Sequence, residues 1–371
     1  MTAFMRATVQ SGASTLPRRY YASQEVFRAE TEQIFYRDWI YIGRAEQIAQ
    51  PGDYFLVQLV GENIIVVRGR DGAARAFFNV CRHRGTRICT AEQGRFTGSI
   101  QCPYHAWTYG LDGHLIAARH MQETAGFEKA GYPLHSAALA EWEGFLFLNL
   151  AQEPEPFEMV FAPLIGKFRA WHMPELRLAR RIEYDVRANW KMIVQNYSEC
   201  YHCPLIHPAL TQLSPPTSGR NDLREGPFLG GYMTLNDTVH SLTIDGRTAR
   251  PPLGEVDGED RYRIYYYSIF PNMLLSLHPD YMMAHTLWPQ SAGRTKIACE
   301  WYFDPAMVEQ ADFDPSDAVE FWDMTNRQDW HVCELSQLGT SSIAYTPGPY
   351  ADAEVLLHAF DQYYLGAMRE M

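Results

Sequence analysis

Residues 79–85 read Asn-Val-Cys-Arg-His-Arg-Gly, and residues 102–107 read Cys-Pro-Tyr-His-Ala-Trp. The two stretches lie at the ends of neighbouring predicted strands, so each forms a short loop with one cysteine and one histidine. A zinc finger instead sets a pair of cysteines against a pair of histidines. One cysteine and one histidine per loop suit a two-iron cluster in which two thiolates hold one iron and two imidazoles hold the other. We therefore predict a 2Fe–2S cluster, with zinc as the alternative, on four ligands: Cys81, His83, Cys102 and His105.

Short predicted strands surround these loops. Alternating apolar residues and Gly- or Asp-containing turns predict strands over 54–60, 64–68, 76–80, 96–101, 107–109, 114–117 and 145–150. Seven short strands in so few residues predict an antiparallel all-β domain, to which we assign residues 41–155. Apolar residues at helical spacing over 20–40 predict a helical N-terminal arm, assigned to residues 1–40. Proline and charge replace the apolar runs at residues 153–156, which predicts a domain boundary.

Residues 156–371 are predicted to form a second domain of the α+β class. Its expected strands are 181–186, 263–270, 281–287 and 295–303. One helix is expected to start near Asn189, and two more are expected over 315–338 and 352–367. Asp314 and Pro315 are expected to cap the first of these two closing helices. Residues 204–258 are rich in Pro, Gly, Ser and Thr, and we interpret them as a functional lid.

Composition limits the partners and the location. The 371 residues carry a formal net charge of -12, which disfavours nucleic acid and anionic membranes as partners. No stretch approaches ~20 uninterrupted apolar residues, so we expect a cytoplasmic protein that does not bind a membrane. The chain has 7 cysteines, an odd number that favours reduced thiols or metal ligands over a disulfide framework. Cys200 and Cys203 are accordingly interpreted as structural residues.

A second group of candidate ligands follows the helix that starts near Asn189. Asn196, Glu199 and His202 are spaced i, i+3, i+6 and would share one helix face. Pro204 cannot sit inside a helix, so we expect the chain to turn after Cys203 and to bring His207 back toward His202. Two histidines beside an acidic residue at such a break predict a metal site.

Two histidines need one carboxylate to form the triad that leaves open positions on Fe(II). At ~100° per residue, most charged side chains of the helix around residue 329 share one face. Asp329 points elsewhere, among uncharged residues, where an unpaired carboxylate would be costly. We predict Asp329 as the third ligand, with Glu334 as the fallback. The residues on the charged face are Asp317, Glu320, Asp323, Arg327, His331 and Glu334.

The motifs at 79–85 and 102–107, and the stretch 196–208 with its two histidines, resemble the Rieske non-haem iron oxygenases, the ring-hydroxylating oxygenase alpha subunit family. The resemblance implies an all-β Rieske domain followed by a catalytic domain with a helix-grip-like antiparallel sheet and helices. It implies one 2Fe–2S cluster and one mononuclear Fe(II) held by His202, His207 and the segment around Asp329. Glu199 is then the bridge to the cluster of a neighbouring subunit, with Asn196 behind the ligands.

The resemblance also implies partners. A separate NAD(P)H-dependent reductase or ferredoxin would donate electrons to the cluster, and His105 would pass them through Glu199 of an adjacent subunit to His202. Such a handoff implies a homotrimer that acts on O2 and a small molecule. The chain has no Gly-x-Gly-x-x-Gly fingerprint for a dinucleotide of its own.

Glu at position 199, where many family members have Asp, makes the chain look most like the choline, carnitine and betaine branch. That branch implies monooxygenation and N-demethylation of a quaternary ammonium or betaine-type substrate. Four aromatic residues are candidates for a cation-binding pocket, with a plain aromatic core as the alternative: Tyr232, Tyr267, Phe270 and Trp288. N-dealkylation of a neutral xenobiotic amide and hydroxylation of an aromatic ring are alternatives on the same iron. A non-catalytic Rieske electron carrier and a ligand-binding protein are alternatives of another class.

Overall fold

The computed structural model describes residues 8–368. It divides into two compact units, Phe35–Phe161 and, within the described residues, 8–34 together with 162–368. In the described part of the chain, no helix has the length and apolar character needed to cross a membrane.

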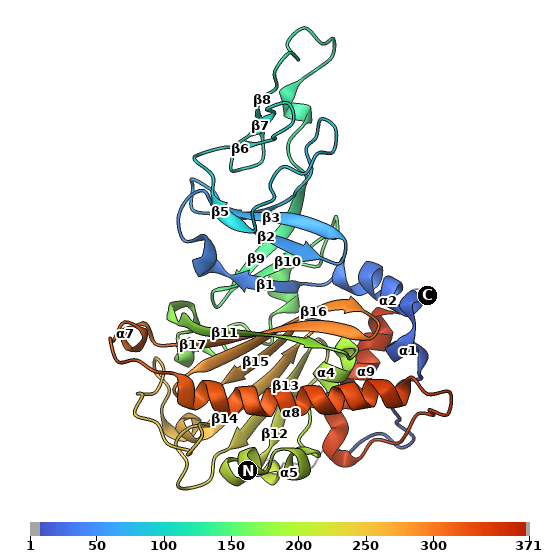
Figure 1. The fold of residues 1–371 in the computed structure, drawn as a ribbon, viewed down its shortest axis with the longest axis vertical. Helices are drawn as coiled ribbons and strands as arrows, with labels where there is room; N and C mark the ends of the chain where they lie inside the picture. The colour runs from blue at the N-terminus through green and yellow to red at the C-terminus, as the bar shows by residue number, and fades with distance from the viewer. Residues whose placement is uncertain (1–7, 369–371) are drawn as a thin grey trace. The chain divides into compact units, whose positions relative to one another are not determined.

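The smaller unit is built on a seven-stranded antiparallel sheet with the strand order β1-β10-β9-β4-β3-β2-β5 (Figure 1). Three of its strands were not predicted. β1 lies a short turn after helical residues and reads as the end of the arm, β5 lies just before the predicted strand 96–101, and β9 has no clear alternation of apolar and polar residues. The bounds are β1 Ile40–Arg44, β2 Asp53–Leu59, β3 Glu62–Arg68, β4 Ala74–Phe78, β5 Gln93–Arg95, β9 Ser136–Trp142 and β10 Phe145–Asn149, with the short helix α3 at Phe157–Val160.

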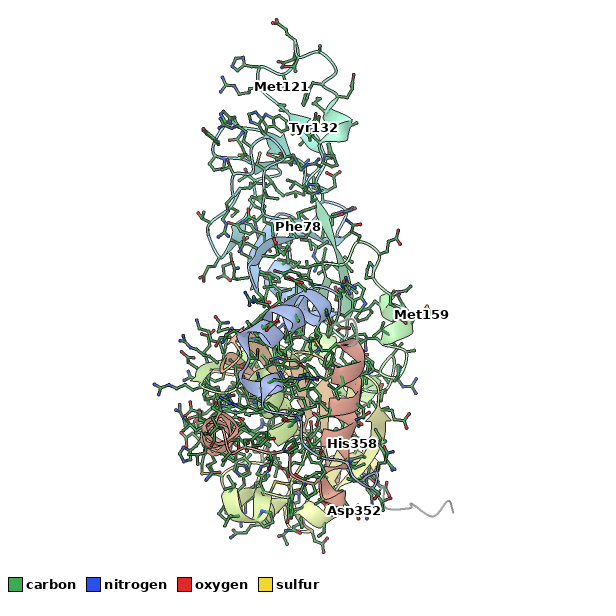
Figure 2. The ribbon with its side chains drawn as sticks, turned by 90° about the vertical axis from the view of Figure 1, so that its right-hand side faces the viewer. Phe78, Met121, Tyr132, Met159, Asp352 and His358 are labelled. Carbon is green, nitrogen blue, oxygen red and sulfur yellow. A yellow bond between two sulfur atoms is a disulfide. The ribbon has the colours of Figure 1, made fainter. Side chains whose placement is uncertain are left out.

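A second, three-stranded sheet in this unit carries the second cysteine–histidine loop between its first two strands. Its strands are β6 (Ile100–Gln101), β7 (Thr108–Tyr109) and β8 (Leu115–Ala117), in the order β6-β7-β8. Figure 2 shows Tyr132 and Met121 beyond Phe78 of β4, at one end of the unit. Tyr132 packs edge-on against Trp107, with ring centroids 5.9 Å apart, so this end of the unit has an aromatic core behind the loops.

The N-terminal arm does not form a domain of its own. Its helices are α1 (Arg19–Ala22) and α2 (Gln24–Glu30), followed by the π-helical turn η1 (Thr31–Phe35). Glu30 of α2 is fully buried and contacts Lys191, which ties the arm to the larger unit. The arm was predicted over 1–40, of which residues 1–7 lie outside the described residues; within the described part, the unit boundary falls at 34/35.

The larger unit is built on a seven-stranded antiparallel sheet in the order β11-β17-β16-β15-β14-β13-β12. The strands β12 and β13 lie inside the segment that was interpreted as a lid, and that interpretation is wrong for residues 220–234. Gly231 of β13 hides the strand pattern, although its missing side chain is required: a Cβ there would lie 1.9 Å from the Arg220 carbonyl oxygen. The bounds are β11 Arg177–Val186, β12 Arg220–Glu225, β13 Phe228–Thr234, β14 Arg263–Ile269, β15 Met273–Leu277, β16 Met282–Ser291 and β17 Arg294–Phe303.

The long helix α8 (Ser316–Thr340) lies across this sheet (Figure 1). Trp322 Nε1 donates to Tyr281 Oη at 2.7 Å, and Tyr184 Oη donates to Asp323 at 2.7 Å, so two adjacent residues of α8 hold the helix against the sheet. The other helices of this unit are α4 Trp190–Tyr197, α5 Cys203–Ile206, α6 Pro208–Leu213, α7 Pro305–Val308 and α9 Val355–Ala367. Short 3-10 turns complete the chain: η2 Ala45–Ile48, η3 Lys129–Gly131, η4 Arg169–Trp171, η5 Met173–Glu175, η6 Pro216–Ser218, η7 Gly258–Tyr262 and η8 Asp352–Glu354.

Candidate metal centres

The two cysteine–histidine loops are built alike. In the first loop, the Gly85 N–H donates to the Cys81 carbonyl at 2.9 Å, and in the second, the Ala106 N–H donates to the Cys102 carbonyl at 3.1 Å. Gly85 and Ala106 both have positive φ angles, +72° and +57°, so each loop closes through one left-handed residue. Each loop therefore turns back on its own cysteine and presents its histidine beyond it.

The four predicted cluster ligands come together with the thiols inside and the imidazoles outside. Cys81 and Cys102 are buried, whereas His83 and His105 are partly exposed, with their Nδ1 atoms 3.2 Å apart. Trp107 stacks on His83 with ring centroids 4.8 Å apart and holds that imidazole in place. Burial, followed by the neighbouring His105, lowers the pKa of His83, which favours the neutral form that binds metal.

This donor set fits a two-iron cluster better than zinc. Thiolates on one side and imidazoles on the other match the unequal ligation of a Rieske-type cluster. Among the described residues, the group whose donor atoms lie close enough to share one ion is His202, His207 and Asp329. The four residues of the two loops do not form such a group. The donor types of the four predicted ligands, two thiolates and two imidazoles, therefore fit a two-iron cluster.

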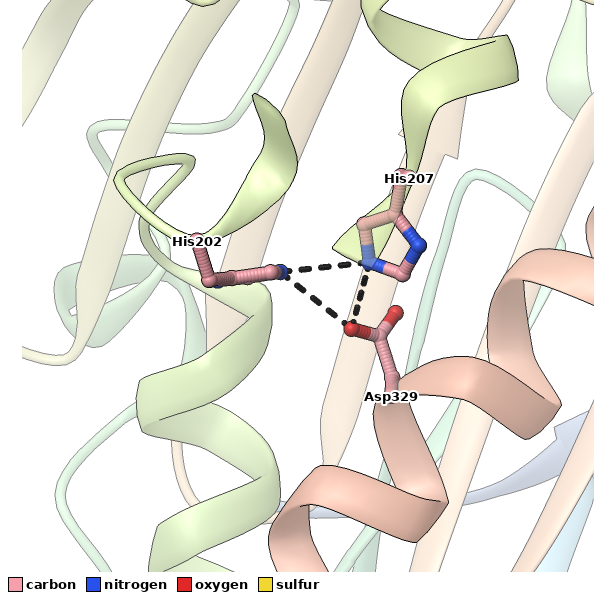
Figure 3. A group of neighbouring side chains, drawn as sticks. All are labelled: His202, His207 and Asp329. Atoms are coloured by element: carbon pink, nitrogen blue, oxygen red, sulfur yellow. Dashed lines mark hydrogen bonds and ion pairs between the residues drawn. The ribbon is translucent and has the colours of Figure 1, made fainter. Parts of the chain in front are cut away.

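A compact metal-sized group forms in the larger unit from His202, His207 and Asp329 (Figure 3). The Nε2 atoms of the two histidines are 3.2 Å apart, and Asp329 Oδ1 lies 2.8 Å from His207 Nε2 and 3.3 Å from His202 Nε2. All three donor atoms point toward one spot. Two imidazoles and one carboxylate are the donor set of the triad that holds non-haem Fe(II) and leaves positions open.

The chain reaches His202 by a turn and not by a helix, so the predicted shared helix face is wrong. α4 ends at Tyr197, and the Ser198 hydroxyl donates to the Val194 carbonyl at 2.6 Å. The Glu199 carboxylate then accepts the backbone N–H groups of Tyr201 and His202. A side chain that satisfies these donors competes with helix continuation.

Pro204 also acts differently from the prediction. It is the second residue of α5, where a missing N–H costs no hydrogen bond, so it helps to start a short helix. His207 terminates α5 and Pro208 begins α6. The five-residue spacing of the two histidines is therefore closed by a one-turn helix between them.

Hydrogen bonds fix which nitrogen each histidine presents. His202 Nδ1 lies 2.5 Å from Glu199 Oε1, and His207 Nδ1 lies 2.7 Å from Gln328 Oε1. With Nδ1 occupied in this way, Nε2 of each ring faces the common centre. Gln328 was not predicted as a functional residue, although its position next to Asp329 was a usable signal.

The charges of the group favour a cation. Burial opposes ionisation of Asp329, but hydrogen bonds from His202 and His207 outweigh burial and lower the pKa of its carboxyl. Burial also disfavours protonated His202, yet the bonds to Asp329 and then Glu199 raise its pKa to about 9. A carboxylate that stays ionised beside two imidazoles supplies the negative charge that a bound cation needs.

The other polar residues that were predicted near the site do not contact the three donor atoms. Asn196 lies on α4, and its buried Oδ1 has no hydrogen-bond partner among the described residues. The fallback Glu334 accepts the Arg187 backbone N–H at 3.0 Å instead. Cys200 and Cys203 are joined in a disulfide, so the expectation of reduced thiols is wrong for this pair.

The structure does not bring the four predicted pocket residues to the metal group. Tyr232 and Tyr267 are on the face of the sheet that carries Tyr265, and the Tyr267 ring packs 5.1 Å from Phe168. Trp288 pairs with Lys296 on that same face. Phe270 packs against Trp190 and the helix α9.

The opposite face of the sheet carries other aromatic residues toward α4 and α8. Tyr266 of β14 packs against Tyr197 of α4 and Trp322 of α8, with ring centroids 6.1 and 6.3 Å away. His285 of β16 accompanies them, 6.3 Å from the Tyr197 ring. Sequence reasoning missed these residues because adjacent strand residues face opposite sides, and the aromatic run at 265–267 does not tell which side is inward.

Models of two protein families match the chain. The Rieske 2Fe–2S domain matches residues 38–129, and the catalytic domain of the ring-hydroxylating alpha subunit matches residues 173–370, which is more than half of the chain. The two matched families imply both a Rieske cluster and a mononuclear non-haem iron, the two groups that the donor sets above fit.

Relatives and solved structures agree with these matches. The glycine betaine monooxygenase oxygenase subunit of Pseudomonas aeruginosa is 31% identical over 374 residues, covering 91% of this chain and 85% of the relative. The carnitine monooxygenase oxygenase subunit of Escherichia coli is 39% identical over 201 residues, 54% of each chain. A solved quaternary ammonium Rieske monooxygenase, studied for carnitine oxidation by gut microbiota and inter-subunit electron transfer, superposes with a TM-score of 0.80 at 27% identity, covering 96% and 95% of the two chains.

The second matched domain removes the simplest alternative. A Rieske electron carrier needs only the smaller unit, whereas more than half of this chain is a catalytic domain that gathers two histidines and a carboxylate. The chain therefore belongs to the Rieske non-haem iron oxygenases, as a ring-hydroxylating alpha-type subunit with a Rieske domain followed by a catalytic domain.

Proposed function

We propose that this chain is the terminal oxygenase of a multicomponent system that removes an N-methyl group from a small quaternary ammonium or betaine-type substrate. The observation that carries the proposal is the convergence of His202, His207 and Asp329 beside a buried aromatic wall. Relatives named for glycine betaine and carnitine support the substrate class. Aromatic faces attract quaternary ammonium groups through their negative π-surfaces.

The residues around the triad have separate tasks. When bound, the ferrous iron activates O2 with electrons that the cluster supplies. His202, His207 and Asp329 would hold the iron, while Glu199 and Gln328 hold the imidazoles in the tautomer with Nε2 free. Oxidation of an N-methyl carbon gives a hemiaminal that releases formaldehyde and the demethylated amine.

Electron delivery is proposed to run between subunits of a homotrimer. Glu199 contacts His202 and lies beside exposed Tyr201, so the bridging carboxylate is near the surface. In the Rieske unit, His105 lies next to Tyr104, which is 55% exposed. Two partly exposed histidine edges of this kind suit a handoff across an interface. A separate NAD(P)H-dependent reductase or ferredoxin would reduce the cluster, and the cytoplasm is the proposed location because that donor needs a nicotinamide reductant.

Turnover tests the proposal. The purified protein, a surrogate reductase and NADH are supplied with trimethylated ammonium compounds, and formaldehyde and NADH are measured together. We expect equal amounts of formaldehyde formed and NADH consumed, and no formaldehyde from His207→Ala. NADH consumption with hydroxylated aromatic rings and no formaldehyde from any N-methyl compound would refute the demethylation proposal. That outcome would favour ring hydroxylation at the same iron.

A further inference from the structure

A buried tyrosine contacts one of the two cysteines that would hold the cluster. Tyr109 is the second residue of β7, and its side chain is fully buried in the core of the smaller unit. Its hydroxyl oxygen lies 3.3 Å from Cys81 Sγ. The same oxygen accepts the backbone N–H of Arg82 at 3.1 Å. One hydroxyl therefore contacts both a predicted cluster ligand and the residue that follows it.

The chemistry of the three groups fixes the direction of these two hydrogen bonds. A backbone N–H can only donate, so the Tyr109 oxygen is the acceptor of the bond from Arg82. A cysteine that binds iron does so as a thiolate, which has no proton to donate. The bond between Tyr109 and Cys81 must therefore use the proton of the tyrosine hydroxyl, and the sulfur is its acceptor.

A hydrogen bond to a ligating sulfur affects the oxidised and the reduced cluster unequally. An electron from the reductase adds one negative charge to the cluster, and no bond forms or breaks. The sulfur ligands then carry more negative charge, so the hydroxyl proton is bound more tightly after reduction than before it. Tyr109 and Cys81 are only 0% and 3% exposed, so water does not compete for this sulfur. The bond therefore favours the reduced state.

We propose that Tyr109 raises the reduction potential of the cluster by donating a hydrogen bond to the Cys81 thiolate. Tyr109 is not itself a ligand and acts through the charge on the sulfur. With this hydroxyl in place, a weaker reductant suffices to reduce the cluster. The inference needs the cluster but not the N-demethylation proposed above, so either proposal can fail without the other.

The test is a redox titration of the purified, cluster-containing protein with dithionite and mediator dyes, in which the EPR signal of the reduced cluster is measured. Tyr109→Phe removes only the hydroxyl. At a given potential, it should shift the ratio of reduced to oxidised cluster about tenfold toward the oxidised form. For a one-electron couple, this shift corresponds to a midpoint potential about 59 mV lower. Iron and acid-labile sulfide should stay at the wild-type level, because every predicted cluster ligand remains.

Tyr54→Phe is the matched control, because Tyr54 lies in the same core and contacts a cysteine that is not a predicted ligand. Its hydroxyl oxygen lies 3.1 Å from Cys89 Sγ, and its side chain is buried. Loss of this hydroxyl changes the same core and leaves the contact to Cys81 in place. The midpoint potential of Tyr54→Phe should equal that of wild type.

A second measurement tests the sign of the effect. 3-Fluorotyrosine, placed at position 109 by nonsense suppression, keeps the ring and the hydroxyl but is a more acidic phenol and a stronger hydrogen-bond donor. At neutral pH, the midpoint potential of this protein should lie above that of wild type, opposite in sign to the change in Tyr109→Phe. A purely structural role of the tyrosine predicts no such reversal.

Three results would overturn the inference. The first is an unchanged midpoint potential in Tyr109→Phe, which would leave the hydroxyl as a structural support of the loop. The second is an equal shift in Tyr54→Phe, because the potential would then depend on the general packing of the unit. The third is a midpoint potential that 3-fluorotyrosine leaves unchanged or lowers, and this result decides the question if Tyr109→Phe assembles no cluster.

Discussion

Gln328 shows how one uncharged residue can control a metal site that it does not touch. Its Oε1 lies 2.7 Å from His207 Nδ1, and this contact leaves Nε2 for the metal. Gln328→Leu should weaken Fe(II) binding about 10- to 100-fold, because such supporting bonds set the tautomer and ring orientation of the ligand. The measurement is competitive titration of the mononuclear site with a chelator. Gln328→Glu keeps an acceptor oxygen and should retain most of the affinity; equal losses in both variants would contradict a positioning role.

Sequence reasoning reached the donor residues but only one of their two supports. The cysteine–histidine pairs, the two histidines around Pro204 and the lone carboxylate on α8 carry recognisable chemistry in their residue types, and the structure gathers His202, His207 and Asp329. Glu199 was named through the family resemblance, and it contacts His202 Nδ1. Gln328 acts through the direction of one hydrogen bond, which residue spacing does not encode. Tyr266 was missed for a similar reason, since the choice between residues 265, 266 and 267 depends on the strand register.

A buried ion pair joins the N-terminal arm to the helix that leads to the metal group. Lys191 of α4 contacts Glu30 of α2, and Tyr364 Oη donates to Glu30 at 2.7 Å. Lys191→Met should lower the free energy of unfolding by about 3–5 kcal/mol, because it leaves a buried carboxylate without its cation. Denaturant unfolding measures the change. Adding Glu30→Gln in the same chain should restore part of the loss, and a purely additive double variant would contradict the coupling.

The helix α9 carries a carboxyl that makes stability depend on pH. Burial raises the pKa of Asp361 to about 7, while hydrogen bonds from Tyr350 and Gln195 act in the opposite direction. An unfolded chain releases this proton near pH 4, so the folded protein binds more protons between about pH 4 and 7. The stabilisation is therefore fully present below about pH 4 and is lost as the pH rises through about 7.

Replacement of that carboxyl tests the pH effect. When the pH rises from about 5 to about 8, the unfolding free energy of wild type should fall by roughly 1–3 kcal/mol more than that of Asp361→Asn. Urea unfolding at both pH values gives the comparison, and Asp312→Asn, at an exposed position, is the control. Parallel pH curves for wild type and Asp361→Asn would show that the carboxyl is already ionised in the folded protein.

The elements that were misread share a physical cause. β13 contains two glycines that allow the adjacent strands to approach closely. In a sequence alone, where the adjacent strand is unknown, two glycines favour the prediction of a loop. The helix after Asn189 was extended too far because the Glu199 side chain, and not a proline, ends it. Close packing between neighbouring strands decided the first case, and the direction of a local side chain decided the second; neither can be read from residue spacing.

In the proposed homotrimer, the cluster of one subunit must supply electrons to the iron of another. Cys81→Ala subunits lack a thiolate for the cluster, and His207→Ala subunits lack a ligand for the iron. Each variant alone should be inactive, whereas mixed trimers from coexpression with two affinity tags should regain part of the activity, because a cluster in one subunit can serve the iron of its neighbour. Mixed trimers that contain both metal centres and remain inactive would contradict electron transfer between subunits.

One chain should hold a two-iron cluster and a separate iron on His202, His207 and Asp329. Iron and acid-labile sulfide are measured in wild type and Asp329→Ala, with Glu334→Ala as the control on the same helix. We expect about three irons and about two sulfides per chain in wild type and Glu334→Ala, and about two of each in Asp329→Ala. Zinc in place of iron, or an iron count that Asp329→Ala leaves unchanged, would contradict it.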